Sequence, residues 1–220
     1  MQTREFNPND PTGKPIRGIP FKSIVLRVTD GKDEANAARM AQARGGASTP
    51  TLELIKASIV TIDGTDIRQP FDDFDAWKTK ARRFADACFS VLNGVTDDDA
   101  RAVLNSAQDD GEAVRFSFNG ADGKPLPYTR IKSVTVREID GRDEEKATLR
   151  ARTQGGIATA TLEMVRLSVV AVDGSAVGED FNTDAWGSKD RALLFACWRE
   201  LNSLSQAESD FLSRREIPTR

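Results

Sequence analysis

The chain contains one stretch of sequence twice. Residues 22–34, KSIVLRVTDGKDE, return as KSVTVREIDGRDE at residues 132–144. Each copy of the surrounding unit is roughly 100 residues long, whereas solenoid repeats recur every 20–50 residues. A unit of that length can bury a hydrophobic core of its own. The sequence therefore predicts a tandem duplication of one small domain.

The repeat also indicates where the two domains lie. Residues 13–64 match residues 123–174 without a gap, and the match resumes after a shift of one residue. We predict domains at residues 1–106 and 112–220, joined by a short polar linker over residues 106–112.

Composition and charge limit the kinds of partner. The 220 residues carry 31 basic and 34 acidic side chains, a net charge of −3, and the two signs are interleaved. A nucleic-acid or anionic-membrane surface needs a basic stripe, so we expect no nucleic acid and no membrane as partner. No run of apolar residues is long enough for a membrane-spanning helix, and residues 1–6 do not resemble a signal peptide. We expect the protein in the cytosol of the cell that makes it.

The start of each unit has the pattern of a β-hairpin. Residues 114–118 alternate apolar and polar side chains, and the turn-rich residues 119–125 follow, which is typical of a hairpin. The returning strand is expected over residues 129–139 in the second copy and 19–28 in the first. Period-two spacing there places alternate side chains on one face.

Helices follow the hairpin. Asp30 is the predicted N-cap of a helix that runs to Arg44 and ends at Gly45-Gly46. The later helices of the first copy are expected over residues 51–62, with an extended tail, from Asp72 or Asp75 to Asn93, and from Thr96. Their counterparts in the second copy include helices that begin at Asp140, at Thr161 and, with a capping box, at Ser205. Each unit is thus predicted as α+β, a β-hairpin followed by three or four helices.

The two cysteines, Cys88 and Cys197, occupy the same place in the two copies. In the first copy one helical face collects the apolar positions 77, 81, 84, 88 and 91 or 92. We predict reduced cysteines in the core, because a disulfide would have to link two separate cores. The chain has no histidine that would activate a thiol.

Acidic and glycine-rich clusters are the candidates for a metal or phosphate site. Residues 30–34 and 72–75 lack the spacing of a calcium loop, and helix capping explains them. The glycine pairs 45–46 and 155–156 follow a helix, so we interpret them as C-caps. The basic cluster on one helix is interpreted as a solvated face: Lys78, Lys80, Arg82 and Arg83. We predict no catalytic, cofactor-binding or metal-binding residues; paired carboxylates are the one remaining route to acid–base chemistry.

A series of short motifs resembles a known family. In the second copy these are Val136–Glu144, Leu162–Val165, Val172–Gly174 and the segment from Asp184-Ala185-Trp186 to Leu201-Asn202. The first copy matches with Arg27, Asp30–Glu34 and Asp63-Gly64. The pattern resembles small tail-assembly and baseplate-hub-assembly proteins of tailed bacteriophages. Those proteins usually carry a single unit, and this chain carries two.

The resemblance implies a non-enzymatic tail or baseplate protein, structural or assembly-related, that acts through protein–protein contacts. It implies other phage tail or baseplate proteins as partners, in the host cytoplasm during assembly and in the virion tail afterwards. We expect a homo-oligomer in a ring or hub, because three chains with two similar domains can mimic a six-fold ring. Two alternatives stay open: a tail assembly chaperone absent from the mature particle, and a carboxylate-using enzyme. We further expect residues 1–12 and 214–220 to lie against neighbouring subunits, because such arms gain order by docking.

Overall fold

Two compact units make up the computed structural model, which describes residues 2–45, 48–69, 71–153, 159–178 and 181–203. Unit 1 comprises Met1–Asp97, Pro125–Arg130 and Asn182–Ala192, and unit 2 comprises Asp98–Lys124, Ile131–Phe181 and Leu193–Arg220. Both contain helices and an antiparallel sheet, so the fold is mixed α+β, as predicted. Separate folding of residues 1–106 and 112–220 stays a prediction.

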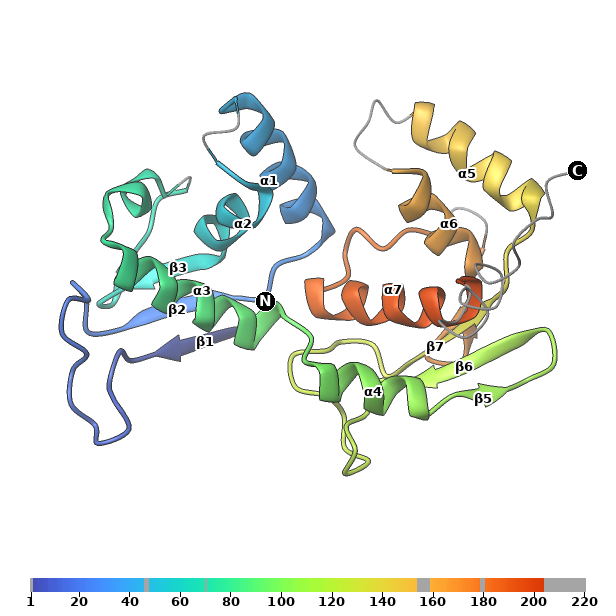
Figure 1. Cartoon of the computed structure of the whole chain (residues 1–220), viewed down its shortest axis with the longest axis horizontal. Coiled ribbons are helices and arrows are strands. Elements are labelled where there is room, and N and C mark those ends of the chain that lie inside the picture. The colour runs from blue at the N-terminus through green and yellow to red at the C-terminus, as the bar shows by residue number, and fades with distance from the viewer. Residues whose placement is uncertain (1, 46–47, 70, 154–158, 179–180, 204–220) are drawn as a thin grey trace, which may run out of the picture. The chain divides into compact units, whose positions relative to one another are not determined.

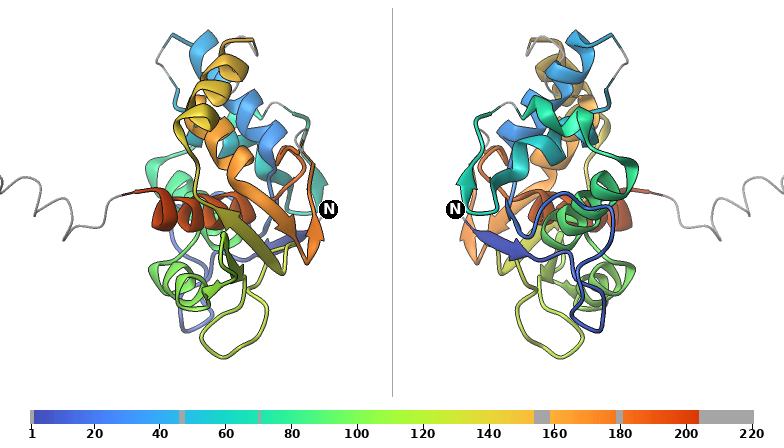
Figure 2. Two further views of the ribbon diagram at one scale, coloured as in Figure 1. Left: turned by 90° about the vertical axis from the view of Figure 1, so that its right-hand side faces the viewer. Right: turned by 90° about the vertical axis from the view of Figure 1, so that its left-hand side faces the viewer.

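Unit 1 is built on a four-stranded antiparallel sheet with the strand order β1-β2-β3-β4, and Figures 1 and 2 show β1 at one edge of it. Its elements are β1 (Thr3–Phe6), β2 (Ile24–Arg27), α1 (Gly31–Ala43), α2 (Pro50–Ser58), β3 (Ile59–Ile62), β4 (Thr65–Asp66), the 3-10 helix η1 (Asp72–Ala76) and α3 (Thr79–Asn93).

The core of unit 1 follows the predicted periodicities. Ile24, Leu26 and Val28 are nearly fully buried, as period-two spacing along a half-buried strand requires. The α3 helix covers them with the buried positions 81, 85, 88, 89 and 92. Leu92 is buried and Val91 is exposed. Of the two positions that the sequence offered for the apolar face of this helix, position 92 is therefore the one in the core.

The element predicted as a helix with an extended tail over residues 51–62 divides in two. The α2 helix ends at Ser58, and the tail, Ile59–Ile62, pairs with β2 as strand β3. All four residues of this strand are β-branched, which favours extended backbone. A turn then leads into β4. The sheet therefore extends two strands beyond the predicted hairpin.

Unit 2 is built on a five-stranded antiparallel sheet with the order β5-β6-β7-β8-β9. From β6 on, the strands and α-helices of the chain follow the same order as those from β1 on, with no counterpart of η1 among the described residues. A common origin of the two halves remains an inference from the sequence. The elements from the end of α3 onward are α4 (Asp97–Asn105), β5 (Gln108–Asp109), β6 (Ala113–Ser117), β7 (Ser133–Arg137), α5 (Gly141–Thr153), α6 (Ala160–Ser168), β8 (Val169–Val172), β9 (Ser175–Ala176) and α7 (Ser188–Asn202).

The predicted polar linker over residues 106–112 contains a strand. Gln108 and Asp109 form β5 and pair with Arg115 and Val114 of β6. Polar side chains do not prevent this pairing, because the ladder is made by backbone groups.

The predicted N-terminal arm does not stand apart from its own domain. Thr3–Phe6 pair with β2 as strand β1, and the Asp10 carboxylate accepts the N–H groups of Thr12 and Lys14 within a turn. The expectation that residues 1–12 lie against neighbouring subunits instead of on their own domain is wrong for these residues. Three other expectations fall outside the described residues: the C-cap at 155–156, the helix from Ser205, and the docking of residues 214–220. Among the described helices, none has the length and apolar character needed to cross a membrane.

Candidate functional site

The first acidic cluster holds the start of α1. The Asp30 carboxylate accepts the N–H groups of Lys32 and Asp33 at 3.0 and 3.1 Å, and the Asp33 carboxylate accepts the Asp30 N–H at 3.0 Å. Asp33 also accepts two hydrogen bonds from the Arg27 guanidinium, at 2.6 and 2.7 Å. The predicted N-cap is confirmed, and both carboxylates are engaged by the fold.

The start of α5 repeats this arrangement. Asp143 accepts two hydrogen bonds from Arg137, at 2.7 and 3.0 Å, and Asp140 accepts the N–H groups of Arg142 and Asp143. The hydrogen bond from Arg137 holds the pKa of Asp143 below its usual range. Within the described ranges, no group of three or more His, Cys, Asp or Glu side chains is placed to hold a metal ion.

An aspartate and an asparagine that occur in both copies connect loops and helix ends to the sheets. Asp63 and Asp173 both adopt a φ of 50°, and each carboxylate accepts two backbone N–H groups at the start of β2 or β7. Asn93 and Asn202 end α3 and α7, and each accepts a backbone N–H from the residues just after β2 or β7, at 2.8 and 2.9 Å. These shared motifs therefore stabilise the fold.

Unit 1 also contains a cluster of charged side chains around α2, of which Lys56 and Glu53 are buried. Lys56 is only 1% exposed, and its Nζ donates to Asp75 Oδ2 at 2.7 Å and to Glu53 Oε1 at 3.3 Å. Arg44 Nη1 lies 3.4 Å from Glu53 and 3.2 Å from Asp75. The hydrogen bond from Lys56 lowers the pKa of Asp75. Asp75, which belongs to the second acidic cluster (residues 72–75), is therefore a counter-ion of Lys56. Its carboxylate stays ionised near neutral pH, so Asp75 is not suited to donate a proton.

The equivalent position of unit 2 carries a simpler pair. Glu163 and Arg166 are both buried, and Arg166 Nη1 donates to Glu163 Oε1 at 2.6 Å. Sequence reasoning missed both ion pairs. The signal was a charged residue at i and i+3 on an otherwise apolar helical face, in both copies.

Cys88 and Cys197 are free and buried, as predicted. Desolvation by burial raises the pKa of each thiol to about 12. A thiol with so high a pKa is protonated at neutral pH, and the thiolate is the nucleophilic form. Neither cysteine is thus poised for chemistry.

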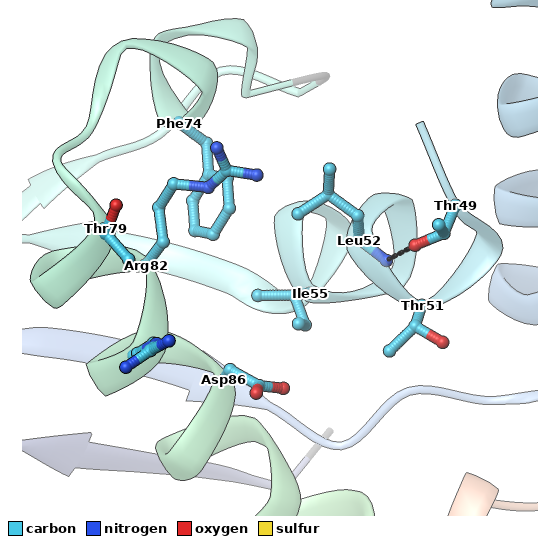
Figure 3. Close-up of a pocket in the computed structure, with 9 residues that line it drawn as sticks. Thr49, Thr51, Leu52, Ile55, Phe74, Thr79, Arg82 and Asp86 are labelled. Carbon is cyan, nitrogen blue, oxygen red and sulfur yellow. Dashed lines mark hydrogen bonds between the residues drawn. The ribbon is translucent and has the colours of Figure 1, made fainter. Parts of the chain in front are cut away.

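A small open pocket of about 250 Å³ lies between α2 and α3 of unit 1 (Figure 3). The Arg82 guanidinium lies over the Phe74 ring, 5.7 Å from its centroid. The basic residues predicted as a solvated face thus divide: Lys78, Lys80 and Arg83 are exposed, and Arg82 is half-buried. The pocket has an apolar floor and a rim of hydroxyl and charged groups, and its lining residues are Thr49, Thr51, Leu52, Ile55, Phe74, Thr79, Arg82, Arg83 and Asp86.

The pocket was not predicted, because Leu52 and Phe74 come from separate elements that only the fold brings together. Its lining suits a short partner side chain with an apolar body and a polar end. Unit 2 does not repeat its chemistry: the positions of Arg83 and Asp86 are occupied there by Ala192 and Phe195.

Comparison of the chain with protein-family models, with curated proteins and with solved structures finds no match. A functional proposal therefore rests on the residues and contacts described above.

Proposed function

We propose that the protein is a non-enzymatic structural or assembly component of a bacteriophage tail or baseplate, which works through protein–protein contacts. One observation carries the protein-contact part of this proposal. Among the described residues, each large hydrophobic residue that is exposed in one copy has a charged residue at the equivalent position of the other. The four pairs are Met40 with Arg150, Leu149 with Arg39, Val91 with Glu200, and Phe195 with Asp86.

This exchange of apolar for charged residues contrasts with the shared interior. The repeated polar residues, such as Asp63 and Asp173, make the same contacts in both units. Large apolar side chains gain free energy when they are buried in the core of a protein–protein interface. Two similar modules with different exposed apolar side chains suit a protein that holds two different partners, or two different faces of one partner.

The assignment to a phage tail is supported by the motifs of the sequence, chiefly Val136–Glu144 with Asp184-Ala185-Trp186. In this proposal the partners are other tail or baseplate proteins. The protein assembles with them in the host cytoplasm and stays in the tail of the particle.

Quantitative mass spectrometry of purified particles, from a lysate of the cells that express this gene, tests the proposal. A structural component appears in a fixed ratio to the other tail proteins. A chaperone makes the same kind of contact but is present in the lysate and missing from the particle. If no particle is made, or if its yield and morphology are unchanged when the gene is deleted, the assignment to tail assembly is wrong.

A further inference from the structure

The outer edge of the unit 2 sheet is covered by the segment that leads into it. Gln108 of β5 pairs with Arg115 of β6. Ser106 Oγ accepts the N–H of Ser117 at 2.8 Å, and its hydroxyl donates to the Val103 carbonyl at 2.6 Å, with the Ser117 carbonyl farther away at 3.2 Å. Val103 of α4, in the same segment, is buried, as is Phe116 of β6. The segment α4–β5 therefore completes the sheet of the unit that follows it in the chain.

The corresponding edge in unit 1 is β1, and no described residue forms a strand beyond it. The Val28 N–H donates to the Gln2 carbonyl at 2.9 Å. In the register of the β1–β2 pair, the backbone N–H and C=O groups of residues 2, 4 and 6 therefore point toward β2. The backbone groups of Thr3 and Glu5 then face outward. Phe6, the counterpart of the buried Phe116, is only partly buried. Such an edge is a template for pairing with another chain.

We infer that β1 pairs with the segment that follows α7 in a second copy of the chain, in the way that β6 pairs with the segment α4–β5. Three features of the sequence support this occupant. Ser205-x-x-Glu208 stands where the first copy has Thr96-x-x-Asp99, at the start of α4. Leu212 stands at the position of the buried Val103. The length also fits: β5 ends 16 residues after α3 (109 − 93), and 18 residues follow Asn202 (220 − 202).

The direction of the contact follows from the chain itself. The segment after α3 joins the sheet of the next unit along the chain, so the segment after α7 joins the first unit of the next chain. Such a head-to-tail contact is heterologous, and it produces a ring if the rotation closes or a filament if it does not. The inference rests on the proposed function in one respect, that the chain acts through protein contacts, and it names the surface and the partner.

Analytical ultracentrifugation of the purified full chain tests this contact. We expect self-association that grows with concentration from the micromolar to the millimolar range. Glu5→Pro removes the outward N–H without breaking a bond to β2, and Leu212→Asp places a charge at the buried position of the docking segment. Each variant should weaken association by about tenfold or more. The controls are Glu5→Ala, which keeps the N–H, and Ala207→Asp, which matches the exposed Asp98 of α4; both should associate like the wild type.

A mixture of the two variants gives the decisive result. The Glu5→Pro chain keeps its docking segment and the Leu212→Asp chain keeps its open edge, so an equimolar mixture should form a one-to-one dimer and nothing larger. Circular dichroism of each variant confirms that it is folded.

A wild-type chain that stays monomeric at every concentration overturns the inference, because the segment then leaves the edge open or binds within its own chain. A mixture that forms no dimer overturns it as well. Both results concern the purified protein alone, so they leave the particle measurement, and with it the proposed function, unaffected.

Discussion

In unit 1 the buried Glu53 is paired with Lys56, and in unit 2 the equivalent Glu163 is paired with Arg166. The lysine is a point charge on a flexible stem, and it also binds Asp75 at 2.7 Å. The arginine reaches its glutamate at 2.6 Å. A buried carboxylate requires a cation beside it, and the two units meet this requirement with different side chains. The interior thus preserves the contact and tolerates a change of residue.

The largest effect is expected from breaking this pair. Lys56→Ala leaves Glu53 buried without its nearest cation, and we expect a loss of about 3–5 kcal/mol in the free energy of unfolding. Lys56→Arg, which introduces the residue found in unit 2, is the matched control and should cost much less. Urea unfolding followed by tryptophan fluorescence measures both. A loss below about 1 kcal/mol for the alanine variant would mean that Arg44 alone neutralises Glu53.

The asparagines at the helix ends allow a second comparison between the units. Asn93 is buried, and its Oδ1 accepts both the N–H and the hydroxyl of Thr29. Asn202 is half-buried and accepts one N–H, from Ile139. We expect Asn93→Ala to cost about 1–3 kcal/mol and Asn202→Ala about 1 kcal/mol. Val91→Ala, at an exposed position of the same helix, should stay within about 0.5 kcal/mol. Equal losses at the two asparagines would contradict the difference in burial.

The sequence predicted the parts of the fold that local chemistry determines. Asp30 is recognisable as a cap because its carboxylate binds N–H groups only two and three residues further along the chain. Cys88 is recognisable as a core residue because the apolar residues around it share a helical spacing. It did not predict β3, because the residues of β2 that pair with Ile59–Ile62 lie 33 to 38 positions earlier in the chain. It also missed β5, whose two polar residues are strand-like only through the backbone of β6. The ion pair of Lys56 with Asp75 joins α2 to η1, and no local sequence pattern predicts such a contact.

The cysteines should behave alike in both units. Cys88→Ala and Cys197→Ala each remove a small buried group, and we expect a loss of about 1 kcal/mol in stability. With the pKa of both thiols raised to about 12, iodoacetamide should leave the native protein unmodified at neutral pH and alkylate both sites in urea. Rapid alkylation of one cysteine in the native protein would show that its unit opens more readily than the other.

The smallest effect concerns the Arg137–Asp143 pair and its dependence on pH. The folded pKa of Asp143 lies below its usual range, so the pair stabilises the fold above about pH 4. This contribution is lost as the pH falls through the lower pKa of the folded state. At pH 7 Asp143→Asn should cost roughly 0.5–1 kcal/mol, and the difference from the wild type should shrink in acid. A difference that does not change with pH would show that the ionic contact contributes nothing.

The two units differ more at the outer edges of their sheets than in any of the interior contacts compared above. In unit 2 the Ser117 N–H donates to Ser106 Oγ, and Arg115 pairs with Gln108. The equivalent residues of unit 1, Asn7 and Glu5, lie at the edge with no strand beyond them among the residues that the structure describes. The two units are therefore alike inside and different at this edge.

Amide hydrogen exchange, measured by NMR in dilute monomeric protein, tests that claim most directly. The amides of Arg115 and Ser117 should be protected, and those of Glu5 and Asn7 should exchange at rates close to those of exposed backbone. Amides of Arg4 and Phe6, which face β2, serve as the internal control and should be protected. Protection of Glu5 and Asn7 equal to that of Arg115 and Ser117 would mean that the edge is already covered within one chain, and would contradict the account.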